Sequence, residues 1–91
     1  MEPNNIEQTL EERGSRYGVY KHQAAISQNL KHIMRAQSNY HVMDPDMQES
    51  LDLIANKIGR ILNGDPHYHD SWHDIAGYAT LVADRLQGVE R

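Results

Sequence analysis

The segment NGDP, residues 63–66, constrains the fold of this chain more than any other feature of its sequence. An Asn-Gly pair commonly ends a helix, and a proline two residues later stops that helix from continuing. On both sides of this break apolar residues recur at helical spacing, over residues 45–63 and over residues 69–86. Because short connections join neighbouring helices, we expect these two helices to lie antiparallel.

Two further helices are predicted earlier in the chain. Residues 4–13 predict a short helix that begins at an Asn cap and ends at Gly14. Residues 20–37 carry an apolar stripe at helical spacing, made of Ile26, Leu30 and Ile33. The connector that follows ends at Asp44-Pro45, a capping residue and then a proline at the first helical position of residues 45–63.

The expected fold class is all-α, an antiparallel helical bundle of three to four helices. No stretch alternates β-branched and polar residues in the manner of a strand. We expect a single domain over residues 1–91, with a short N-terminal helix and turn in residues 1–19 and a helical core in residues 20–90. A chain this short buries only about 60% of its unfolded surface. We therefore expect a homodimer or a higher homo-oligomer that shares its core.

Composition excludes several classes of function. The formal net charge is −4, with 9 basic and 13 acidic residues, so duplex DNA is not an expected partner. The chain has no cysteine, and therefore neither disulfides nor a thiolate zinc site. The N-terminus is polar and acidic, unlike a signal peptide, and no apolar run approaches the roughly 18 residues that span a bilayer. We expect a cytoplasmic protein without a membrane partner.

The helix predicted over residues 45–63 carries a polar stripe opposite its apolar face. Rotation by about 100° per residue places Glu49, Asp52, Asn56 and Arg60 within roughly 80° of one another, with Lys57 beside them. The apolar face is made of Leu51, Ile54, Ile58, Ile61 and Leu62. Two interpretations stay open for the stripe, a solvated face with ordinary ion pairs or part of a binding site.

Asp74 in the following helix lies at the edge of the packed face, between Leu81 and Tyr78. A partly buried carboxylate without a partner loses solvation energy, so it should be neutral, paired with a cation or bound to a metal. One interpretation is an interhelical ion pair with Lys57 or Arg60. The other is a metal site.

Acids from both helices favour a Mg²⁺ site, because hard divalent cations prefer oxygen ligands and keep several waters. The candidate metal ligands are Glu49, Asp52, Asp70 and Asp74. The candidate catalytic residues are Glu49, Asp52 and Asp74. The candidate residues for nucleotide phosphates are Asn56, Lys57 and Arg60.

The segments ESLDLIANKIGRI (49–61) and DSWHDIAGYA (70–79) resemble the all-α nucleotide pyrophosphohydrolases of the MazG-like kind, in particular the short MazG-like proteins of phages and prophages. The resemblance covers about residues 47–86, and RYG (16–18) with His22 resembles the lead-in of these phage proteins. In that superfamily E-x-x-E on one helix and E-x-x-D on the next hold Mg²⁺ against a nucleoside triphosphate, which is cut to monophosphate and pyrophosphate.

The resemblance assigns Glu49 and Asp52 to the first pair, with Asp in place of the second Glu, and Asp74 to the end of the second motif. Ser71 departs from the family, because it stands where the second motif has Glu. Asp70 lies one residue earlier, a rotation of about 100° on a helix. The departure leaves a rival function open, a non-catalytic small phage protein that binds a host protein through an oligomeric helical surface in the bacterial cytoplasm.

Other features favour less specific interpretations. His67, His69 and His73 invite a zinc site, but His73 is on the side expected to be exposed and no HExxH signature is present. Trp72 and Tyr78 fit core or interface positions, with base stacking as the alternative. Glycines inside helices cost about 1 kcal/mol relative to alanine, so Gly59 and Gly77 predict close helix approach, within the chain or across a subunit interface.

Overall fold

The computed structural model describes residues 5–91, and all regular secondary structure in that range is helical. The helices are α1 (Asn5–Tyr17), α2 (Tyr20–Arg35), α3 (Ser38–Val42), α4 (Pro45–Asn63) and α5 (His69–Leu86). The expected all-α class is confirmed. Across residues 5–91, no helix combines the length and the apolar character that crossing a bilayer requires.

The two helices around NGDP begin and end where the sequence predicts, whereas the N-terminal helix is longer than expected. Gly14 lies inside α1, and the helix ends before Gly18, whose φ of 77° is a conformation that glycine adopts without strain. The expected cap at Asn4 lies outside the described residues. The short helix α3 lies in a segment expected to be an irregular connector.

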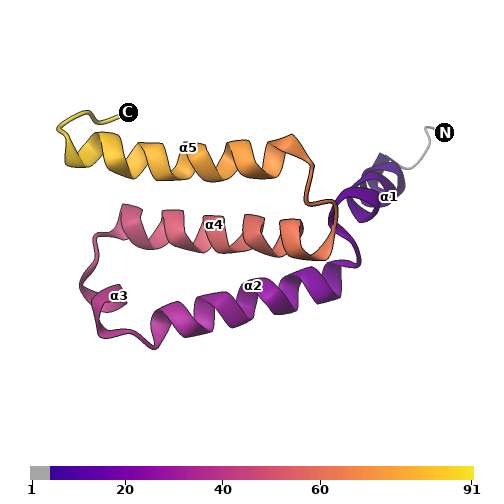
Figure 1. The fold of residues 1–91 in the computed structure, drawn as a ribbon, viewed down its shortest axis with the longest axis horizontal. Coiled ribbons are helices and arrows are strands. Elements are labelled where there is room, and N and C mark those ends of the chain that lie inside the picture. The colour runs from indigo at the N-terminus through magenta and orange to yellow at the C-terminus, as the bar shows by residue number, and fades with distance from the viewer. Residues whose placement is uncertain (1–4) are drawn as a thin grey trace.

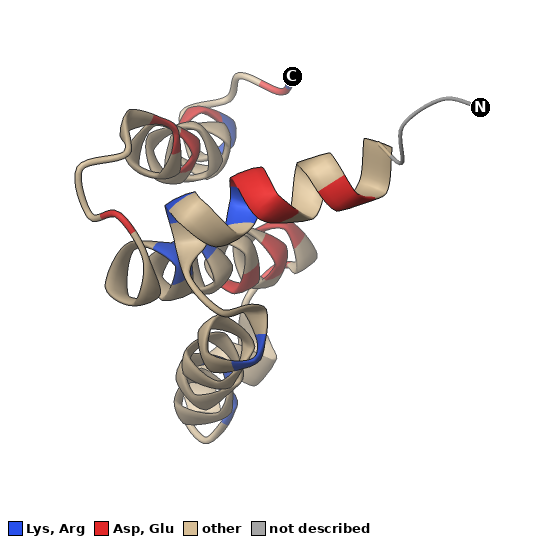
Figure 2. Ribbon diagram, turned by 90° about the vertical axis from the view of Figure 1, so that its right-hand side faces the viewer, with Lys and Arg blue, Asp and Glu red and all other residues tan. Residues whose placement is uncertain are grey.

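Helix α4 is the central element of the fold. Figure 1 shows α2, α4 and α5 side by side, with α4 between the other two, and α4 packs against both neighbours. Figure 2, which looks along the long helices, shows α1 crossing one side of this layer. The layer therefore has two seams, one between α2 and α4 and one between α4 and α5.

Small residues form the seam between α2 and α4. Gly59 and Ala55 of α4 are buried, and a Cβ at Gly59 would lie 3.0 Å from the backbone oxygen of Gln23. The buried residues of α2 are Gln23 and Ser27. The expected stripe of α2 does not fill this seam, since its member Ile33 is 60% exposed. The close backbone approach at Gly59 leaves room for only small or flexible side chains at this contact.

The turn at NGDP packs directly on the turn between α1 and α2. The Asn63 side-chain amide donates hydrogen bonds of 2.9 Å to the backbone oxygens of Tyr17 and Val19. A Cβ at Gly18 would lie 2.3 Å from the backbone oxygen of Asn63, and one at Gly64 would lie 2.1 Å from that of Arg16. Glycine at both positions is what lets the two turns touch.

The opposite end of the layer is held by Arg85 of α5. Its guanidinium donates to Asp46, with Nη2 2.8 Å from Oδ1, and to Asp44, with Nη2 2.9 Å from Oδ2. The hydrogen bond from Arg85 holds the pKa of Asp46 below its usual value. Asp44 occupies the expected capping position before Pro45, but its side chain makes no capping hydrogen bond. Its carboxylate binds Arg85 instead.

We predict that Gly59→Ala and Gly77→Ala shift stability differently, although both replace a glycine inside a helix. A Cβ at Gly77 has no atom within 4 Å, so that variant gains helix propensity, about 1 kcal/mol. At Gly59 the new methyl meets the backbone of α2, and overpacking cancels or exceeds that gain. Urea unfolding of both variants gives the comparison. Equal stabilisation of the two variants would show that α2 moves away from position 59 at no cost in folding free energy.

Asp46 should make stability depend on pH at the acid end. Its folded-state pKa lies below the ordinary 3.8, so its contribution is fully present above that value and is lost as the pH falls through the folded pKa. We expect Asp46→Asn to lower the melting temperature at neutral pH and to flatten its decline below about pH 4. Glu11→Gln, an exposed change in α1, is the control. If the melting temperature of Asp46→Asn fell with decreasing pH as steeply as that of the unsubstituted protein, Asp46 would not have this role.

Candidate functional site

Asp52 of α4 faces the seam with α2. Its Oδ2 accepts a hydrogen bond of 2.7 Å from Nη2 of Arg35, and its Oδ1 accepts one of 3.2 Å from the hydroxyl of Tyr40. Burial, and then the nearby Asp52 carboxylate, raise the pKa of Tyr40 above its usual value. Two donors from different segments thus hold the Asp52 carboxylate in a fixed orientation.

Glu49 precedes Asp52 by three residues, so the two carboxylates lie on neighbouring positions of one helix face. Glu49 is exposed, and no ion pair joins it to another residue of the described chain. The Asp52 carboxylate is therefore held by hydrogen bonds, whereas the Glu49 carboxylate is accessible.

Asp74 forms the interhelical ion pair that was one of its two predicted fates. Its Oδ2 lies 3.1 Å from Nζ of Lys57, and the Lys57 side chain is only 12% exposed. Lys57 therefore neutralises Asp74 across the seam between α4 and α5. This pairing takes Lys57 away from the predicted phosphate site.

Asp70 lies at the start of α5, one turn before Asp74. Its Oδ2 accepts a hydrogen bond of 2.8 Å from the hydroxyl of Tyr68, and this bond lowers the pKa of Asp70. The Tyr68 hydroxyl in turn accepts a hydrogen bond of 2.9 Å from Arg16. The neighbouring Ser71, where the family motif has Glu, is buried at 3% exposure.

The four predicted metal ligands therefore lie in two pairs, one on α4 and one on α5. Within residues 5–91, no three histidine or acidic side chains form a group that could hold a metal ion. His69 and His73 stack on each other, with ring centroids 5.4 Å apart. Glu49 and Asp52 share a face of α4, and Asp70 and Asp74, four residues apart, share a face of α5.

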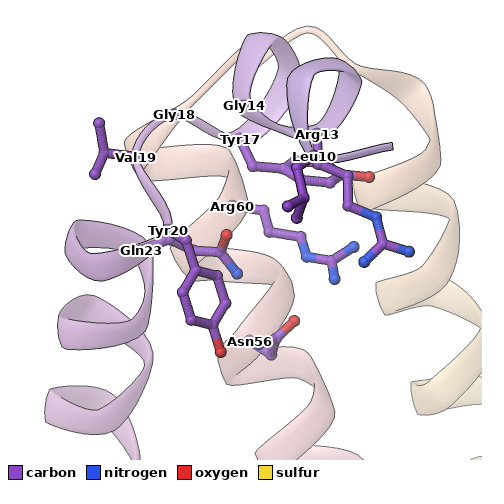
Figure 3. A pocket seen from close by; sticks show the side chains of 10 residues that line it. All are labelled: Leu10, Arg13, Gly14, Tyr17, Gly18, Val19, Tyr20, Gln23, Asn56 and Arg60. Atoms are coloured by element: carbon purple, nitrogen blue, oxygen red, sulfur yellow. The ribbon is translucent and has the colours of Figure 1, made fainter. Parts of the chain in front are cut away.

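A pocket of about 570 Å³ opens between α1, the start of α2 and α4. Figure 3 shows its side chains, with Arg13 of α1 and Arg60 of α4 extending toward the same side and Asn56 one turn along α4. The complete lining is Leu10, Arg13, Gly14, Tyr17, Gly18, Val19, Tyr20, Gln23, Asn56 and Arg60. Two of the three predicted phosphate-binding residues, Asn56 and Arg60, thus line one cavity.

Arg60 has an unusual environment for a cation. Its guanidinium carbon lies 4.4 Å from the centroid of the Tyr17 ring, a cation–π contact. Its Nε is buried and has no hydrogen-bond partner among the described residues. Neither Arg60 nor Arg13 forms an ion pair within residues 5–91. Two uncompensated positive charges at one cavity favour an anionic ligand.

Several residues of this region were not predicted from the sequence. Arg35 and Tyr40 were not expected to hold Asp52, and Arg13, Tyr17 and Tyr20 were not expected to line a pocket. Antiparallel packing of α2 on α4 places the end of one helix beside the start of the other, so a basic residue near position 35 is a natural partner for Asp52. No sequence pattern predicts the pocket, because its walls depend on how α1 crosses α4.

Comparison of the chain with protein-family models, with curated proteins and with solved structures gives no match. The resemblance to MazG-like proteins thus rests on the two sequence motifs alone.

We predict that Asp74→Asn destabilises the protein by about 1 kcal/mol, because it leaves the largely buried Lys57 without a counter-charge. The double variant Asp74→Asn/Lys57→Met should recover most of this loss, since it removes both charges. Urea unfolding of the two single variants and the double variant measures the coupling energy. Additive effects would mean that the pair contributes nothing to folding.

Proposed function

We propose that this chain binds a nucleoside triphosphate together with Mg²⁺ and hydrolyses it to the monophosphate and pyrophosphate. The observation that carries the proposal is one polar stripe along α4. It begins with the carboxylates of Glu49 and Asp52, continues through Asn56 and ends at Arg60 in the pocket. From Glu49 to Arg60 the stripe spans roughly 16 Å. Acidic and basic ends on one face suit a ligand that carries both a metal ion and phosphates.

The pocket supplies the chemistry that phosphates and a base require. Guanidinium groups bind phosphate oxygens through directed hydrogen bonds, and Arg13 and Arg60 lack competing carboxylates within the described chain. Tyr20 is largely exposed at the rim of the pocket. Its ring offers a flat surface on which a base can stack.

Glu49 and Asp52 are the residues that would hold Mg²⁺. One or two carboxylates with water and substrate phosphate oxygens are sufficient for this ion, and these two acids share a helix face. When bound, Mg²⁺ neutralises phosphate charge and lowers the pKa of coordinated water. Asp70 and Asp74 are engaged by Tyr68 and Lys57, and Asp52 is engaged by Arg35 and Tyr40, so Mg²⁺ would bind first at Glu49 and would compete with Arg35 for Asp52.

The proposed reaction adds the oxygen of one water to the α-phosphorus. The bond from that phosphorus to the oxygen bridging the α and β phosphates breaks, pyrophosphate leaves with the bridging oxygen, and the water proton passes to solvent. Arg60 and Arg13 would compensate the charge that accumulates on the phosphates. Asn56 would donate from its amide to a phosphate oxygen.

The second candidate function is non-catalytic binding of a host protein by a phage-encoded homo-oligomer. Burial of Ser71 favours it, because the position that carries a ligand in the family motif is closed here by a small neutral side chain. The lack of a group of three possible metal ligands within residues 5–91 favours it as well. This function requires no nucleotide.

Pyrophosphate release from a panel of ribo- and deoxyribonucleoside triphosphates, measured with and without Mg²⁺, separates the two functions. Glu49→Gln and Asp52→Asn should each reduce release by about tenfold or more, because each removes a ligand charge. Glu90→Gln, an exposed acid near the C-terminus, is the matched control and should leave the rate unchanged. Arg60→Ala should weaken nucleotide binding while the helical content stays the same.

Absence of pyrophosphate release, together with absence of nucleotide-induced thermal stabilisation in Mg²⁺, would reject the enzyme and leave the protein binder. Stabilisation by nucleotide without release would restrict the proposal to binding. Loss of helicity in Arg60→Ala would assign that residue to folding through its contact with Tyr17.

A further inference from the structure

The three long helices form one layer, and a layer of helices buries only its seams. Helix α4 packs against α2 and α5 on its two sides, and α1 crosses one broad side at one end (Figure 2). The buried apolar residues are few, namely Tyr40, Ala55 and Ile61. Stable domains generally contain at least two packed layers around a core. Helices α2, α4 and α5 of one chain form only one such layer, and a second layer must come from elsewhere.

The broad side opposite α1 carries large apolar side chains on all three long helices, with His22 of α2 beside Ile33. On α4, about 100° per residue places Leu51 and Leu62 roughly opposite Arg60, which faces the pocket under α1. The same construction places Ile33 of α2, and Trp72 and Leu86 of α5, on that side. We name this set the apolar face, consisting of Ile33, Leu51, Ile58, Leu62, Trp72 and Leu86.

Large side chains of the apolar face are open to solvent in the single chain. Leu62 is 67% exposed, Leu86 58% and Trp72 55%. No Asp, Glu, Lys or Arg falls on the part of each helix that forms this face, by the same helical rotation. A groove of about 300 Å³ lies along it, lined almost entirely by apolar side chains of α4 and α5 such as Met47, Ile54 and Val82. Exposed large apolar side chains gathered on one face favour an interaction site.

The accessible area of the chain supports the same conclusion in quantitative terms. The surface measures 6731 Å², whereas a compact monomer of 10.5 kDa exposes about 5400 Å². The radius of gyration is 15.5 Å, against about 12 Å for a compact domain of this length. Part of the excess of roughly 1300 Å² comes from α1, which has no buried residue, and an interface of standard size buries about 800 Å² from each partner.

We infer that the apolar face binds the same face of a second copy of this chain, which supplies the missing layer. An uncharged apolar face is complementary to itself, as a two-fold symmetric interface requires. The few buried apolar residues mean that the chain needs its partner in order to fold stably, and a second copy is always present at synthesis. This inference specifies the surface of the proposed homo-oligomer and does not depend on nucleotide binding.

Light scattering after size exclusion and sedimentation equilibrium test the inference on the full chain. We expect a mass of twice the 10.5 kDa chain and a melting temperature that rises with protein concentration. Leu62→Glu should raise the dissociation constant by about 30-fold or more. Leu81→Glu is the control, because Leu81 is also exposed but lies on the side of α5 away from the apolar face.

The single tryptophan provides a readout that needs no variant. Trp72 should be protected from iodide quenching at high protein concentration and become accessible on dilution. Where Leu62→Glu fails to fold, Ile33→Glu on α2 tests the same face from another helix. A monomeric wild-type protein with a concentration-independent melting temperature would overturn the inference. So would an oligomer that Leu81→Glu dissociates and Leu62→Glu leaves intact.

Discussion

The fold depends on the contact between two turns, RYG at residues 16–18 and NGDP at residues 63–66. The Asn63 amide binds two backbone oxygens of the first turn, and glycines at positions 18 and 64 remove the side chains that would keep the turns apart. This contact joins the start of α2 to the end of α4, and it directs α1 across α4. The pocket around Arg60 exists because of that direction. A side chain at either glycine would displace both turns and with them the pocket.

Ion pairs hold the layer at positions that the turn contact does not reach. Arg85 binds the start of α4, Lys57 binds Asp74 in the middle of its seam, and Arg35 binds Asp52 from α2. All three join different helices, so α4 is tied to both neighbours by charge as well as by packing. The same pairs decide the chemistry available to the predicted site. They engage Asp52 and Asp74 and leave Glu49, Arg13 and Arg60 accessible to a ligand.

The sequence predicted the helices around NGDP well, because capping residues, proline and apolar spacing are local signals. It predicted less about packing. Gly59 was expected to allow close approach, and it does so against α2, whereas Gly77 has open space beside it. On α2 the sequence predicted an apolar stripe, whereas the buried residues of the seam are Gln23 and Ser27, outside that stripe. Local spacing identifies an apolar stripe without specifying which neighbour covers it, and a second chain can be that neighbour. For Asp74 the sequence left both an interhelical ion pair and a metal site open. No local sequence pattern indicated that Arg13 would line the pocket.

Helix α1 contains no buried residue, although it forms one wall of the pocket. Its attachment lies at its C-terminal end, where Tyr17 contacts Arg60, Arg16 bonds to Tyr68, and the backbone oxygens of Arg16 and Tyr17 accept hydrogen bonds from the NGDP turn. Segments with so little buried surface open at a small fraction of the global unfolding free energy. Amide hydrogens of α1 should therefore exchange much faster than those of α4, and a ligand held between the two helices would slow that exchange. The rate of amide exchange in α1 would therefore report whether a ligand occupies the pocket.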